Sequence, residues 1–431
     1  MNVYDSERIS DLLKPMGFER SENPDNCDIN ILNTCHIREK ASEKMYSDIG
    51  RLSRLKENRL KSGHDMKIII AGCVAQAEGE QIFKRNKNVD IVIGPQSYHK
   101  ITKLLKKKSS KLIENNFPKE SKFDFFPNTK TNSSTAFLTI QEGCDKFCSF
   151  CVVPYTRGAE FSRSVNEIMF EANHLVSQGV KEITLLGQNV SAYCGNFSTG
   201  GSTTKFHLAD LMDKLSSIVK LKRIRYLTSH PADINSDLIM IHGTNKKIMP
   251  YLHLPIQSGS NRILKKMNRK HSRESYIEII EKIRKVRKDI AITSDFIVGY
   301  PGESDSDFRM TLDLVKKINF AGSYSFKFSP RPGTPSAMKN SFVPAETADK
   351  RLKILQAELN DQQNKFNGSF KKKSLSVLFE KKGTKENQYV GRSQYMQPVH
   401  VISNDNLIGK IKNVKIKNVE SFSLHGNISK N

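Results

Sequence analysis

Three cysteines stand close together in the stretch GCDKFCSFC, at positions 144, 148 and 151. Thiolates are good ligands for zinc and for iron–sulfur clusters. A structural zinc site closes with four protein ligands, whereas this local group stops at three. A four-iron cluster held by Cys144, Cys148 and Cys151 keeps one iron open for a substrate or cofactor. The spacing favours such a cluster, and a zinc site with a distant fourth ligand or a disulfide are the alternatives.

Two further cysteines come directly after strand-like apolar runs. Cys35 follows ILNT, and Cys73 follows IIIAG. Ligands of open parallel sheets bind beyond the carboxyl ends of the strands, so we expect Cys35 and Cys73 to share one site. Burial as ordinary core thiols is the alternative.

Composition narrows the class of protein. The chain has 431 residues, enough for two or three domains, and its net charge is +24. Such an excess is typical of a nucleic-acid partner, with a merely solvated lysine-rich surface as the alternative. Seven cysteines in so long a chain do not suit a disulfide framework. The amino terminus lacks a signal-peptide core and the apolar runs are too short to span a membrane, so we expect a soluble, cytoplasmic protein.

The elements that must position these residues fall into three regions and a linker. Residues 1–107 alternate helical patterns with the strand candidates DINILNT, MKIIIAG and VDIVIG, which predicts a parallel α/β domain. Residues 108–133 show no period and carry two prolines, which indicates a linker. Residues 134–367 repeat strand and helix six times, which predicts an incomplete β/α barrel. Residues 368–431 contain five short strand-like runs, which predict a small β-barrel.

Conspicuous residues follow every predicted strand of the β/α barrel, at the end where such barrels carry their chemistry. They are Cys144 to Cys151, Gly187-Gln188-Asn189, Ser229-His230, Gln257-Ser258, Gly299, and Ser329 with Arg331. Each alone is also explained as a turn or cap residue. Their occurrence after all six strands indicates a site.

The C-terminal region is basic. From Lys371 onward it holds 12 basic and 4 acidic residues. A small basic barrel with Tyr389 and Tyr395 is expected to bind RNA, since aromatic rings stack on bases. A solvated β-domain that serves only in assembly is the alternative.

Taken together, these motifs resemble the radical S-adenosylmethionine (SAM) methylthiotransferase family. GCDKFCSFCVVPYTRG resembles the radical SAM signature, NTCHIREKASEKMYSDIGRL and AGCVAQAEGE resemble the amino-terminal methylthiotransferase domain, and LLGQNVSAY, HLPIQSGS and SDFIVGYPGE resemble the radical domain. The tail resembles the TRAM RNA-binding domain. The resemblance covers nearly the whole chain and implies an α/β protein with an incomplete (β/α)6 radical SAM barrel and a C-terminal TRAM barrel.

Within the family, NTCHIREKASEKMYS and CVVPYTRG are most similar to the branch that modifies isopentenyladenosine in tRNA. That branch adds a methylthio group to carbon 2 of N6-isopentenyladenosine next to the anticodon. It implies a tRNA anticodon loop and an electron-donor protein as partners, and we expect a monomer. The same chemistry on threonylcarbamoyl-adenosine or on a ribosomal protein, and a non-catalytic iron–sulfur protein that binds RNA, are the alternatives.

The resemblance also implies site residues. A 4Fe–4S cluster on the three clustered cysteines would bind SAM at its open iron, with an aromatic ring on the adenine side and the turn after the second barrel strand at the methionyl part. These residues are Cys144, Cys148, Cys151, Phe150, Gly187, Gln188 and Asn189.

By the same resemblance, Cys35 and Cys73 would hold an auxiliary 4Fe–4S cluster that carries the sulfur to be transferred. The family has a third cysteine and a first strand just upstream of the stretch that here begins MNVYDSER. Cys27 lies across an intact strand from Cys35, and Cys194 lies in a Gly/Ser/Thr-rich segment expected to be a mobile loop. We therefore expect the auxiliary cluster to be under-ligated, because the start codon is placed too late or the chain is incomplete.

Overall fold

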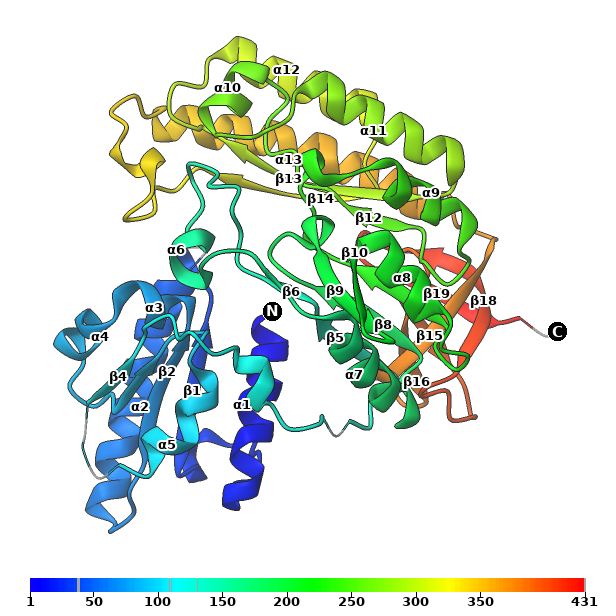
Figure 1. Ribbon diagram of the computed structural model, residues 1–431. Coiled ribbons are helices and arrows are strands. Elements are labelled where there is room, and N and C mark those ends of the chain that lie inside the picture. Colours follow the sequence, from blue (N-terminus) through cyan, green and yellow to red (C-terminus); the bar gives the residue numbers. More distant parts are fainter. Residues whose placement is uncertain (37–38, 108, 110, 130, 430–431) are drawn as a thin grey trace. The chain divides into compact units, whose positions relative to one another are not determined.

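The computed structural model describes residues 1–36, 39–107, 109, 111–129 and 131–429, which fold into two compact units (Figure 1). Unit 1 contains residues 1–129, 142–145 and 151–160, and unit 2 contains residues 130–141, 146–150 and 161–431. No helix within the described ranges combines the length and the apolar character that crossing a bilayer requires.

Unit 1 is built on a parallel sheet of four strands in the order β1-β2-β3-β4. These are β1 (Ile29–Thr34), β2 (Lys67–Gly72), β3 (Ile91–Ile93) and β4 (Leu112–Glu114). The first three coincide with the predicted strands. The fourth lies in the segment expected to be a linker, where three residues pair with β3 at the sheet edge. Such a short, half-exposed strand leaves no hydrophobic period in the sequence.

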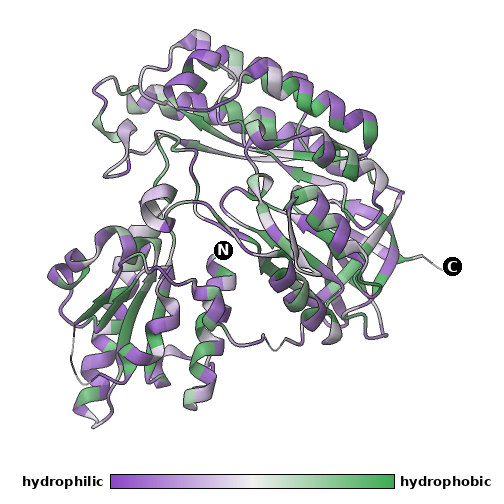
Figure 2. Cartoon of the chain, in the orientation of Figure 1, coloured by the Kyte–Doolittle hydropathy of each residue, from purple (hydrophilic) through white to green (hydrophobic). Residues whose placement is uncertain are grey.

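Helices cover both faces of this sheet. They are α1 (Asn2–Leu13), α2 (Glu39–Lys61), α3 (Cys73–Glu78), α4 (Glu80–Arg85) and α5 (Ile101–Leu105). Successive strand residues face opposite sides, so Ile68 and Ile70 pack with α2, α3 and α4, whereas Ile69 and Ala71 pack with α1 and α5. Burial on both faces explains why β2 is a continuous apolar run. The strands of this sheet are largely green in Figure 2, the colour of hydrophobic residues.

Unit 2 contains the six barrel strands that the repeats predicted. They are β5 (Thr135–Thr139), β8 (Glu182–Leu186), β11 (Arg223–Tyr226), β12 (Tyr251–His253), β13 (Ala291–Val298) and β14 (Gly322–Lys327). They form two parallel three-stranded sheets, β11-β8-β5 and β12-β13-β14, which a parallel bridge between Ile224 and Ile248 connects. The predicted incomplete β/α barrel is confirmed.

Amphipathic helices follow these strands and bury their apolar faces in one core. They are α7 (Val165–Ser177), α8 (Leu208–Ser216), α9 (Ser236–Thr244), α10 (Asn261–Lys266), α11 (Arg273–Val286), α12 (Asp305–Ile318) and α13 (Ala345–Gly368). Ser164, Ser272 and Ser304 cap three of them, each accepting a hydrogen bond from a backbone N–H three residues on.

The segment around Cys194 is not a mobile loop, which corrects the expectation from its composition. It forms an antiparallel hairpin of β9 (Cys194–Thr199) and β10 (Ser202–His207). Gly200 and Gly201 make the turn with positive φ angles of 56° and 81°, a conformation that favours glycine. The Gly-rich composition therefore marks a tight turn.

The C-terminal region forms a closed five-stranded barrel in the order β15-β16-β17-β19-β18. Its strands are β15 (Ser374–Lys382), β16 (Gln388–Ser393), β17 (Pro398–Ile402), β18 (Ile411–Val419) and β19 (Leu424–Ile428). The predicted small barrel is confirmed, but Tyr389 and Tyr395 are not available to stack on RNA. Both are buried in the barrel's core, because the strand alternation and the packing of Phe370 against Tyr395 turn the rings inward.

A buried ionic cluster attaches this barrel to the β/α barrel. The Arg225 guanidinium donates to Glu182 at 2.9 Å and to the carbonyl oxygens of Gln394 and Ser393 at 2.9 and 2.8 Å. Arg223 donates to the carbonyl oxygen of Ser376 at 2.9 Å. Buried charges are tolerated only when paired and hydrogen-bonded, so these arginines fix the barrel in one position.

Candidate functional site

The middle of the cysteine loop, residues 146–150, is held by the segment that follows α10. The Ser149 backbone N–H donates to the Met267 carbonyl oxygen at 2.9 Å, and its hydroxyl donates to the Lys266 carbonyl oxygen at 2.9 Å. Asn268 donates from its side chain to the Phe147 carbonyl oxygen at 2.8 Å. These bonds fix the backbone on both sides of Cys148.

Cys148 is buried and has a cationic neighbour. Its sulfur lies 3.4 Å from Nη1 of Arg269, while Nη2 of the same side chain donates to the Pro255 carbonyl oxygen at 2.6 Å. A fixed guanidinium beside a sulfur atom suits a thiolate, the form that binds iron. Nothing in the cysteine spacing pointed to Arg269, which comes 121 residues later.

Cys144 and Cys151 belong to unit 1. The Cys144 backbone N–H donates to the Gly158 carbonyl oxygen at 3.2 Å, and the Cys151 sulfur accepts from the Val153 N–H at 3.5 Å at the start of α6 (Val153–Arg157). Gly143 has a φ of 74°, and a Cβ there would lie 1.9 Å from the Ala159 carbonyl oxygen. Only glycine fits before the first cysteine.

Within the described ranges, the structure gathers no three histidine, cysteine or carboxylate side chains around one metal-sized point. The thiolates of a four-iron cluster bind separate iron atoms and so need not converge on one point. The assignment of the three clustered cysteines as cluster ligands stays a prediction, as does that of the other site residues.

The turn after β8 carries the predicted Gly187-Gln188-Asn189 stretch. The Gln141 side-chain oxygen accepts from the Gln188 and Asn189 N–H groups at 2.9 and 3.1 Å, and a Cβ on Gly187 would lie 2.5 Å from that oxygen. Gln141 thus fixes the turn after β8. Its position in the sequence, shortly after β5, did not predict this role.

Asn189 is connected to the cysteine loop through a carboxylate. Its side chain donates to Asp233 at 2.8 Å, and the other Asp233 oxygen accepts from Lys146 at 2.7 Å. Sequence reasoning missed Asp233, although the SHPADI stretch after β11 holds it. Asp233 therefore connects the turn after β8 to Lys146 of the cysteine loop at the carboxyl end of the strands in unit 2.

Phe150 is half-buried and packs against Ile263, Met267 and Tyr300. Its ring therefore belongs to the packing between the cysteine loop and α10. A contact with the adenine of SAM stays a prediction.

Two histidines, the buried His230 and the half-buried His271, lie at the same end of the barrel. The imidazoles of His230 and His271 are 5.4 Å apart, edge to face. Burial, followed by the Arg269 charge, lowers the pKa of His230 to about 2 and that of His271 to about 3. Both rings are therefore neutral at physiological pH. Among the described residues, Nε2 of His230 and both ring nitrogens of His271 have no hydrogen-bond partner.

In unit 1, Cys35 and Cys73 lie at adjacent strand ends, as the sheet pattern predicts. β1 and β2 pair in register from Ile29–Lys67 to Thr34–Gly72, so the two cysteines follow directly paired residues. Gly72 has a φ of 96°, and a Cβ there would lie 2.5 Å from the Thr34 carbonyl oxygen. Cys73 is buried and Cys35 is half-buried, whereas Cys27 stands at the opposite end of β1.

A buried ionic cluster lies beside this pair of thiols. Arg157 donates to Asp5 at 2.6 Å and to Glu142 at 3.0 Å, and Lys122 donates to Glu142 at 2.7 Å. Burial by itself would lower the pKa of the Arg157 guanidinium. The pKa is raised instead, because negative charges lie nearby, that of Asp5 first and that of Cys73 second. A permanent cation near Cys73 suits an anionic sulfur ligand.

Three family matches divide the chain. Residues 138–315 match the radical SAM superfamily, residues 1–94 match the uncharacterized protein family UPF0004, and residues 369–428 match the TRAM domain. The four-part division at residues 107, 133 and 367 stays a prediction.

Curated relatives match along nearly the whole chain. Proteins named tRNA-2-methylthio-N(6)-dimethylallyladenosine synthase from Rickettsia conorii, Rickettsia felis and Rickettsia typhi are 53%, 52% and 52% identical over 434 residues, which cover 99% of this chain and 97% of each relative.

Solved structures share the fold at low identity. The radical SAM methyltransferase TsrM from Kitasatospora setae has a TM-score of 0.55 at 13% identity, covering 78% of this chain and 74% of that chain. The cobalamin-dependent SAM radical enzyme OxsB has a TM-score of 0.52 at 13% identity, covering 82% of this chain and 53% of that chain.

Proposed function

Because this chain belongs to the family of the tRNA-2-methylthio-N(6)-dimethylallyladenosine synthases, we propose that it adds a methylthio group to carbon 2 of N6-isopentenyladenosine next to the anticodon of tRNA. The observation that carries the proposal is 53% identity over 99% of the chain. It is supported by the three-cysteine loop at the carboxyl end of a barrel strand.

Membership of the radical SAM superfamily implies a 4Fe–4S cluster and SAM. When bound, they supply the radical chemistry that an adenine C–H bond demands, since that bond is too weakly acidic for a histidine or carboxylate base. The sequence-based prediction of a radical SAM enzyme is confirmed by the family matches.

In this proposal, Cys144, Cys148 and Cys151 hold the SAM-binding cluster. Arg269 orients the Cys148 sulfur and balances its charge at 3.4 Å. The turn at Gly187 to Asn189 presents polar groups to the methionyl part of SAM, and the Gln141 side chain keeps that turn in place. The imidazole of His230 is a buried polar group at this end of the barrel. It is neutral at physiological pH and therefore does not act as an acid there.

The second cluster is a separate part of the proposal. Cys35 and Cys73 hold an auxiliary 4Fe–4S cluster, with a bound sulfur as the group to be transferred. The register of β1 and β2 supports this pairing of thiols, and the Arg157 cation supports an anionic group beside Cys73. Under-ligation of this auxiliary cluster stays a prediction.

The partners follow from the reaction. A single-stranded anticodon loop presents the target base at little unstacking cost, and the basic TRAM barrel supplies positive charge for the RNA backbone. An electron-donor protein would supply the electron that the SAM-binding cluster needs. We place the enzyme in the cytoplasm, where tRNA is used, and propose that it acts as a monomer.

The test expresses this chain in cells that lack the modification and measures their tRNA by mass spectrometry. A mass gain of one methylthio group on isopentenyladenosine is expected. Cys148→Ala should abolish both the gain and the release of deoxyadenosine by the reduced protein. Cys27→Ala changes the cysteine at the opposite end of β1 from Cys35, and as the matched control it should keep both. A methylthio group found instead on threonylcarbamoyl-adenosine or on a ribosomal protein would contradict the proposed substrate.

A further inference from the structure

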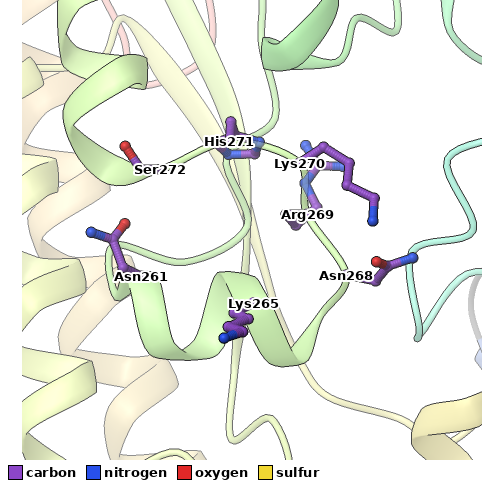
Figure 3. Close-up of a pocket in the computed structure, with 7 residues that line it drawn as sticks. All are labelled: Asn261, Lys265, Asn268, Arg269, Lys270, His271 and Ser272. Atoms are coloured by element: carbon purple, nitrogen blue, oxygen red, sulfur yellow. The ribbon is translucent and has the colours of Figure 1, made fainter.

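A polar pocket in unit 2 lies between α10 and α11 (Figure 3). Its volume is about 510 Å³, enough for a nucleotide-sized group. Its lining residues are Asn261, Lys265, Asn268, Arg269, Lys270, His271 and Ser272. Three of these side chains are cations and none is a carboxylate, so the lining favours an anion.

The two lysines are free to bind such an anion. Lys265 on α10 and Lys270 in the following loop are exposed, and neither takes part in an ion pair among the described residues. The Glu274 carboxylate accepts a hydrogen bond from the Asn261 side chain at 2.8 Å. Ser272 caps the 14-residue helix α11 at the pocket wall, where the helix dipole adds positive potential.

The loop that lines the pocket also holds the cysteine loop. Asn268 donates to the Phe147 carbonyl oxygen at 2.8 Å, and Arg269 lies 3.4 Å from the Cys148 sulfur. An anion bound between Lys265 and Lys270 therefore lies beside the loop whose Arg269 contacts the Cys148 sulfur, a candidate cluster ligand. Along an RNA strand, the phosphates nearest the reacting base are the anions that approach such a position.

We propose that this pocket binds a backbone phosphate of the RNA strand that flanks the target adenine. The inference rests on the proposed function and adds to it a contact outside the C-terminal barrel. Lys265 and Lys270 neutralise the phosphate, and the α10–α11 loop transmits its position to the cysteine loop. Phosphate contacts of this kind fix the register of a nucleic acid and leave base recognition to other groups.

The test measures binding of an anticodon stem-loop RNA that contains isopentenyladenosine to the iron-loaded protein between 50 and 400 mM salt. The double variant Lys265→Ala/Lys270→Ala should lose affinity and show a shallower slope of log affinity against log salt. One lost single-strand phosphate contact lowers that slope by about 0.7, which corresponds to about an eightfold loss at 50 mM salt. The control Lys316→Ala/Lys317→Ala removes two exposed lysines from the end of α12 and should bind as the wild type does.

Deoxyadenosine release without RNA and the iron content should be unchanged in the double variant, which separates a binding defect from a damaged cluster. Equal RNA affinity and slope in wild type and double variant would overturn the inference while leaving the proposed function intact. If inorganic phosphate binds in the pocket but the double variant binds RNA as tightly as the wild type, the pocket is a site for small anions, and this result would also overturn the inference. Failure of the wild type to modify tRNA would overturn the proposed function instead.

Discussion

Removing the Arg225 side chain should loosen the C-terminal barrel from the β/α barrel. Arg225 is 2% exposed and Glu182 is 4% exposed. In Arg225→Ala, the Glu182 carboxylate loses its 2.9 Å partner, and the carbonyl oxygens of Gln394 and Ser393 lose their donors. The five-stranded barrel then keeps its own strand pairing but loses the support of the β/α barrel, so its strands open more often.

The size of the effect follows from the buried charge. Breaking a buried ion pair by deleting one partner costs about 3–5 kcal/mol. Arg223 stays 3.5 Å from Glu182 and compensates part of the charge, so we expect the lower end, about 3 kcal/mol. A loss of that size raises the population of the undocked barrel about 100-fold.

Hydrogen exchange followed by mass spectrometry measures this opening directly. Amides of β15 and β16 should exchange up to about 100-fold faster in Arg225→Ala, and tRNA should bind more weakly because the TRAM barrel is no longer fixed. Lys412→Ala changes an exposed basic residue of β18 and serves as the control for hydrogen exchange alone, since the basic residues of this barrel are themselves proposed to contact RNA. Glu182→Gln/Arg225→Met removes both charges of this pair and should restore part of the protection, since Arg223 loses its carboxylate and the Gln394 and Ser393 carbonyl oxygens still lack their donors. Exchange in Arg225→Ala within threefold of the wild type would refute the reasoning.

Three further outcomes test the candidate site. Gly143→Ala should reduce the iron content of the SAM-binding cluster, since the new Cβ would lie 1.9 Å from the Ala159 carbonyl oxygen. Gln141→Ala should raise the KM for SAM while stability falls by about 1–3 kcal/mol, because two backbone N–H groups of the following turn lose their acceptor. The lowered pKa values of His230 and His271 predict that the free energy of unfolding falls as the pH drops below about 6.5, because only the unfolded chain takes up protons on these rings. The fall should be about 1.4 kcal/mol per pH unit for each histidine. Urea titrations at pH 7 and pH 5 should show a smaller loss of stability in His230→Asn than in the wild type.

The pattern of the sequence was sufficient for the main architecture. Apolar runs of four to eight residues alternating with amphipathic helices have few stable arrangements, so all six barrel strands and the five-stranded C-terminal barrel were predicted. The placement of Cys35 and Cys73 at neighbouring strand ends was also predictable, because parallel strands put their carboxyl ends at one edge.

Tertiary structure decided what depends on contacts between distant segments. A three-residue edge strand such as β4 exists because β3 offers it a partner, and no local period announces it. Tyr395 is buried because Phe366 and Phe370 of the segment before the barrel pack against it. The basic composition of the surrounding region had instead suggested an exposed ring that binds RNA.

The same holds for the polar groups around the candidate site. The identities of Arg269, Gln141 and Asp233 gave no sign of a role, since each is one polar residue among many along the chain. Their partners are fixed by the closing of the barrel, which brings Arg269 to Cys148 across 121 residues and Gln141 to Asn189 across 48. Periodicity determines which face of an element is buried, but a hydrogen bond is made only when the fold has brought a donor and an acceptor within about 3 Å of each other.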